Sequence, residues 1–124
     1  MDTIQRSVEL LQQGQAVAQG EIDLILCASI PAGAKRAEAE NGLLILGHSE
    51  TGHHHALALV EDVEVYDEDE FTSYVANRTA EIIELRHYKT GPDRHQSLGI
   101  PPHSTVKVIR GREYTPEGFR RVAD

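Results

Sequence analysis

The chain is short, acidic and rich in aliphatic residues. It has 124 residues and a formal net charge of -8, with 40% hydrophobic and 26% charged residues. This length leaves room for one hydrophobic core, so we expect a single domain over residues 1–124, with a helical segment at 1–14 and a β-rich body at 15–124. The negative charge argues against direct nucleic-acid binding, because phosphate recognition requires clustered Lys and Arg.

Charge is unevenly distributed along the sequence. Seven of the ten residues from Glu61 to Glu70 are acidic, whereas the segment from Lys107 to Arg121 contains five basic residues and two acidic ones. A chain with one acidic and one basic segment can pair head to tail with copies of itself. Two solvated surfaces are the alternative interpretation.

The N-terminal segment has a helical pattern. Asp2 can cap a helix, Gly14 can end it, and the apolar residues between them recur at helical spacing. We therefore predict a helix over residues 2–13.

Beyond this segment, apolar and polar residues alternate with the period of two that is typical of strands. The predicted strands are 22–26, 43–46, 53–60, 62–66, 71–76, 80–88 and 104–110. A helical turn within 68–83 is the main alternative there, and one helical turn is predicted from Thr115, with Pro116 at its first position. The pattern predicts a mainly β fold, a small barrel or sandwich of about seven short strands with a short N-terminal helix.

Seven histidines in a chain of this length are the most unusual feature of the composition. On a strand, His53 and His55 would point to the same side, about 6.5–7 Å apart. Neutral imidazole binds zinc and manganese, and other strands could supply His87 and His95 as further ligands, with His103 as another candidate. These four histidines, His53, His55, His87 and His95, form the predicted metal site.

Two other roles stay open for these histidines, namely structural hydrogen bonding and catalysis. The nearest candidate carboxylates are Glu50 and Glu61. The spacing is similar to the first motif of cupins, which has His-x-His followed by a carboxylate, although Glu61 lies slightly too far along the chain. No nucleophile elbow, phosphate-binding loop or dinucleotide fingerprint is present, so a non-enzymatic role is favoured over an enzymatic one.

Three stretches, in order, resemble an uncharacterised family of small phage- and prophage-associated proteins. They are Gln19–Leu26, Gly47–His55, and Arg112–Pro116 together with Arg120–Asp124. The family pattern has Gln-Gly-Asp before an apolar strand, a Thr-Gly-His-x-His turn, a later pair of histidines and an Arg-Glu-Tyr ending. Here Glu21 replaces the usual Asp. The resemblance implies a phage-type context and no known activity.

These features predict a non-enzymatic phage-type accessory or structural protein, for example a virion or capsid-associated component. We expect it to act through self-assembly or through other phage or host proteins, in the host cytoplasm or the virion. Neither a secretory signal peptide nor an apolar run of membrane-spanning length is visible, so we expect neither secretion by that route nor membrane contact. The alternative is a small His-ligated metal-binding protein, in its most developed form a cupin-like metalloenzyme, that takes zinc or manganese.

Overall fold

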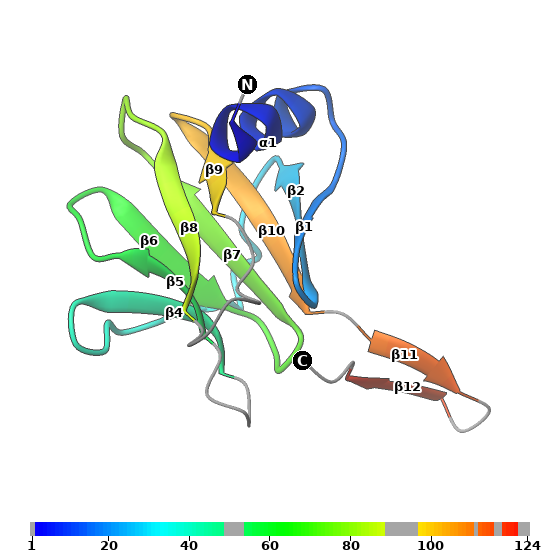
Figure 1. Cartoon of the computed structure of the whole chain (residues 1–124). Coiled ribbons are helices and arrows are strands. Elements are labelled where there is room, and N and C mark those ends of the chain that lie inside the picture. Colours follow the sequence, from blue (N-terminus) through cyan, green and yellow to red (C-terminus); the bar gives the residue numbers. More distant parts are fainter. Residues whose placement is uncertain (1, 49–53, 89–96, 111, 116–117, 122–124) are drawn as a thin grey trace.

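A computed structural model describes residues 2–48, 54–88, 97–110, 112–115 and 118–121. Two antiparallel sheets form the body, and one helix, α1 (Thr3–Gln12), lies across one end of them (Figure 1). In spatial order, the six-stranded sheet consists of β1 (Val17–Gln19), β2 (Ile22–Cys27), β10 (Ser104–Arg110), β7 (Thr72–Asn77), β6 (Val63–Asp67) and β3 (Lys35–Arg36). The four-stranded sheet consists of β4 (Leu43–His48), β5 (His54–Ala58), β8 (Ile83–Tyr88) and β9 (Leu98–Ile100).

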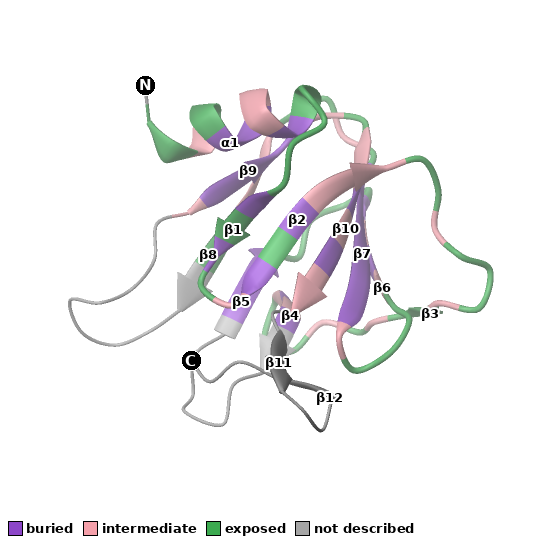
Figure 2. Cartoon of the chain, turned by 90° about the vertical axis from the view of Figure 1, so that its right-hand side faces the viewer, coloured by how far each residue is buried: buried purple, intermediate pink, exposed green. Residues whose placement is uncertain are grey.

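The two sheets pack face to face as a sandwich. Side chains from both sheets meet in one aliphatic core, which includes Leu24, Val75 and Val106 from the larger sheet and Leu46 and Leu57 from the smaller one. Figure 2 shows the burial along these strands, with β7 buried over its whole length between β10 and β6. The core is aliphatic because the chain has few aromatic residues and many Val, Leu and Ile residues.

The mainly β class and the N-terminal helix are confirmed, and the barrel alternative is wrong. A barrel requires the first and last strands to pair, whereas the edge strands of the larger sheet, β1 and β3, pair with no strand of the smaller sheet within the described residues. The two sheets contain ten described strands rather than about seven. The additional strands, β1, β3 and β9, have only two or three residues each, too few for an alternating pattern to be recognisable.

The prediction of a helical turn from Thr115 is also wrong. The structure has a separate hairpin there, in which β11 (Arg112–Thr115) pairs with β12 (Gly118–Arg121). Cross-strand pairing along four register positions replaces the local capping that Thr115 and Pro116 would have supplied to a helix. Residues 68–83, where a helical turn was the alternative, contain β7 and the start of β8.

Helix α1 docks on β9 through a close contact at Gly99. The Asp2 side chain accepts a hydrogen bond from the backbone N–H of Gln5, and Val8 and Leu11 are buried against the sheets. The Ser7 hydroxyl accepts from the backbone N–H of Gly99 at 2.7 Å. This helix is too short for a membrane span, and no helix in the described part of the chain is long and apolar enough to cross one.

Candidate functional sites

A tight turn between β1 and β2 presents two polar side chains to the opposite sheet. Gln19 pairs with Ile22, which leaves Gly20 and Glu21 as a two-residue turn. Gly20 has φ of 59°, and a type II′ turn requires a positive φ at this first position, where glycine is tolerated best. The turn therefore places Gln19 at the end of β1 and Glu21 immediately before β2, both within reach of β5.

His55 on β5 lies between these two side chains. Its ring is fully buried, with Nδ1 at 2.9 Å from Oε1 of Gln19. Nε2 lies 3.1 Å from both carboxylate oxygens of Glu21. The Glu21 side chain is itself only 8% exposed. We call these three residues the Gln19–His55–Glu21 cluster.

The hydrogen bonds define where the protons of this cluster lie. Nε2 of Gln19 donates to the carbonyl oxygen of Leu85 on β8, so Oε1 faces His55 and Nδ1 must be a donor. On the other side of the ring, Nε2 faces a carboxylate, which accepts hydrogen bonds when it is ionised. The arrangement is thus an imidazolium–carboxylate pair, in which both ring nitrogens donate.

This geometry gives the cluster a clear structural capability. Burying a polar group is favourable only when it is hydrogen-bonded, and here a residue of the six-stranded sheet binds His55 and Leu85 of the four-stranded sheet. The cluster therefore connects the two sheets at one end of the core. A metal ion bound at Nε2 would have to replace the proton shared with Glu21.

The structure brings together one pair of the predicted metal ligands. His55 and His87 are direct register partners on β5 and β8. His53, His95 and Glu50 lie outside the described residues, Glu61 is exposed in a turn, and His103 is exposed with φ of 50°. Within the described ranges, no three His, Cys, Asp or Glu side chains are close enough together to hold a metal ion.

Gln19 and Glu21 have no assigned role in the sequence analysis, which considers Glu50 and Glu61 as the carboxylates. The available signal was the Gln-Gly-Glu stretch, the first motif of the resemblance, in which two polar residues flank a glycine immediately before a buried strand. Contact across the sandwich joins it to the second motif, because His55 belongs to the Thr-Gly-His-x-His stretch.

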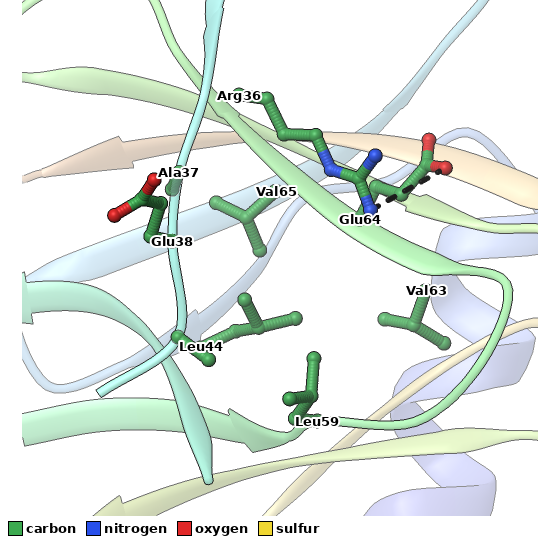
Figure 3. Close-up of a pocket in the computed structure, with 9 residues that line it drawn as sticks. Arg36, Ala37, Glu38, Leu44, Leu59, Val63, Glu64 and Val65 are labelled. Carbon is green, nitrogen blue, oxygen red and sulfur yellow. Dashed lines mark ion pairs between the residues drawn. The ribbon is translucent and has the colours of Figure 1, made fainter. Parts of the chain in front are cut away.

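A second candidate site is an apolar hollow of about 400 Å³ between the edges of the two sheets. Figure 3 shows Leu44 and Val65 at its floor, with Leu59 on one rim and Arg36 and Glu38 on the other. Leu59 is 54% exposed and the adjacent Val60 is 40% exposed. The predicted strand 53–60 ends at Ala58, so Leu59 is exposed whereas Leu57 is buried.

Glu64 balances the nearby cations at the rim of the hollow. Nη2 of Arg36 lies 3.9 Å from one Glu64 oxygen, and Nε of Arg78 donates to the other at 3.3 Å. The Tyr66 hydroxyl donates to the same carboxylate at 2.9 Å. These contacts lower the pKa of the Glu64 carboxyl below its ordinary value of 4.5, with the Tyr66 hydrogen bond as the largest cause.

Comparison with known proteins places the chain in one family. Neither the curated proteins nor the solved structures contain a match. Residues 18–110 match the family model described as "Domain of unknown function (DUF8820)". The matched segment contains the Gln19–His55–Glu21 cluster and the apolar hollow, whereas α1 and the β11–β12 hairpin lie outside it. Since the match covers well over half of the chain, this protein belongs to the DUF8820 family.

Proposed function

We propose that the protein is a non-enzymatic accessory protein of phage type that acts by binding another protein chain, either a second copy of itself or a different partner. The observation that carries the proposal is the apolar hollow with Leu59 exposed at its rim. Exposed apolar surface beside a concave apolar surface is typical of protein interaction sites. The phage-type part of the proposal rests on the three sequence stretches described above.

The state of His55 supports a non-enzymatic role. A general acid or base must reach the proton it transfers, and this imidazole is fully buried with both ring nitrogens bonded to protein groups. Its contacts explain its position through stability alone.

Size-exclusion chromatography with light scattering, at low and high salt, tests the proposal together with binding to the other proteins of the particle. We expect self-association or a stable complex. A strict monomer at every salt concentration that binds none of those proteins would contradict it.

A small metal-binding protein is the second candidate function, favoured by the cross-strand register of His55 with His87 and by the Glu21 carboxylate beside Nε2. A zinc or manganese ion would use His55 and Glu21 as ligands and release the proton between them. Elemental analysis of protein purified without a His tag, with a thermal shift on adding either metal, tests this function. A content below about a tenth of an equivalent and no shift in Tm would exclude it.

A further inference from the structure

The β11–β12 hairpin has the composition of a docking element. Its register places Tyr114 opposite Phe119 and Arg112 opposite Arg121, so two aromatic residues occur among arginines. Among the described elements, its extensive contacts are those between its own two strands. An isolated two-stranded hairpin is marginally stable in water and is stabilised when it packs against other structure.

The apolar hollow has the complementary composition. Its floor is aliphatic, and exposed carboxylates surround it: Glu38 lies on the rim, and Glu61 and Asp62 lie in the turn that leads to Val63. The two nearby arginines, Arg36 and Arg78, both contact Glu64. A basic segment that carries a large apolar side chain therefore fits this surface by both shape and charge.

The hairpin does not reach the hollow of its own chain. Figure 1 shows the hairpin beyond the end of β10, on the side of the molecule away from β4 and β6, whose residues line the hollow. Each chain thus presents the hairpin on one side and the hollow on the other. A contact between two different surfaces of identical chains is heterologous, and its repetition produces a ring or a filament.

We infer that the β11–β12 hairpin of one copy docks in the apolar hollow of the next copy, so that the protein assembles head to tail. This inference rests on the proposed function and identifies its partner as a second copy of the same chain. Phe119 or Tyr114 enters the hollow beside Leu59, and the arginines of the hairpin face the carboxylates around it. Because these charges are close to solvent, the assembly weakens as salt rises.

Complementation between two variants tests the inference. Leu59→Glu disables the hollow and leaves the hairpin intact, whereas Phe119→Ser disables the hairpin and leaves the hollow intact. We expect each variant alone to lose self-association by about tenfold or more, because buried aromatic and aliphatic anchors carry most of the energy of an interface. An equimolar mixture of the two has one functional interface and should form a 1:1 dimer that grows no further.

Light scattering and sedimentation measure the masses, and thermal melts confirm that each variant is folded. Gln12→Glu, which adds the same charge on the exposed face of α1, should assemble as the wild type does. Arg120→Glu should weaken assembly most at low salt. A mixture that stays monomeric, or a Phe119→Ser chain that assembles normally, would overturn the head-to-tail contact.

The wild-type mass separates this inference from the proposed function. A wild-type monomer that still binds another particle protein overturns head-to-tail assembly and leaves the proposed function intact. A wild-type monomer that binds no such protein overturns both.

Discussion

At the scale of single residues, the Glu21 carboxylate has the largest expected effect on stability. It faces a buried imidazolium at 3.1 Å, and removing one partner leaves the other charge buried and uncompensated. We predict that Glu21→Ala lowers the free energy of unfolding by about 3 kcal/mol, as measured by urea denaturation.

Asp23 provides the matched control for this substitution, since it is an exposed carboxylate two residues further along the same hairpin. Asp23→Ala should change the stability by no more than about 0.5 kcal/mol. Equal losses in the two variants would show that the imidazolium–carboxylate pair contributes little to the fold.

At the scale of elements, the docking of α1 depends on the absence of a side chain at Gly99. A Cβ there would lie 2.8 Å from Cγ2 of Ile4 and 2.9 Å from the backbone oxygen of the same residue. The helix would have to move, because a backbone atom cannot rotate away as a side chain can. We predict that Gly99→Ala lowers the free energy of unfolding by about 1–3 kcal/mol and increases amide exchange in α1.

Gly33 gives a control with the same chemical change. No atom lies within 4 Å of a Cβ built at this position, and its φ is not positive. Gly33→Ala should be neutral, or stabilising by about 0.4–1 kcal/mol through the unfolded chain. If both variants behaved alike in urea denaturation, the contact between α1 and β9 would not be tight.

At the scale of the whole molecule, two carboxyl groups define the acid limit of stability. Contacts with Tyr66 and Arg78 lower the pKa of Glu64, and hydrogen bonds from Ser97 and Arg86 lower the pKa of Glu84. A folded pKa below the unfolded value stabilises the fold above the unfolded pKa, and this contribution is lost as pH falls through the folded pKa.

Glu64→Gln should therefore lose less stability than the wild type when the pH falls from about 5 to 3, by a difference of up to about 1 kcal/mol. Urea midpoints across this range measure the effect, with exposed Glu61→Gln as the control. A slope in Glu64→Gln equal to that of the wild type would contradict the assignment.

The alkaline limit involves Tyr74, whose hydroxyl donates to Glu68 at 2.6 Å. This hydrogen bond to a carboxylate is the main reason that the pKa of Tyr74 is raised from 10.0 to about 12. The raised pKa stabilises the fold fully below pH 10, and the contribution disappears as pH rises towards 12. Ultraviolet titration should show a late phenol ionisation that is absent in Tyr74→Phe and shifted to lower pH in Glu68→Gln. A late ionisation that persists in Tyr74→Phe would assign it to another tyrosine.

Local pattern was sufficient for the helix and for the longer strands. The spacing of apolar residues between Asp2 and Gly14 predicted α1, and alternation predicted β2, β6, β7 and β10 to within one or two residues at each end. These elements are determined locally because capping and burial on one face both leave a periodic trace in the sequence. The mainly β class follows from that trace, as does the aliphatic character of the core.

Only the tertiary structure decided which residues meet. The strands β1, β3 and β9 are held by their neighbours rather than by a recognisable pattern, and the separate edges of the two sheets distinguish a sandwich from a barrel. The same holds for the polar cluster: Gln19 and Glu21 are more than 30 residues from His55 along the chain, at separations of 36 and 34. The histidine spacing marked His55 as unusual, but its partners come from a turn in the opposite sheet. Sequence patterns record the face on which a side chain lies, whereas the packing of one sheet on the other selects what lies across from it.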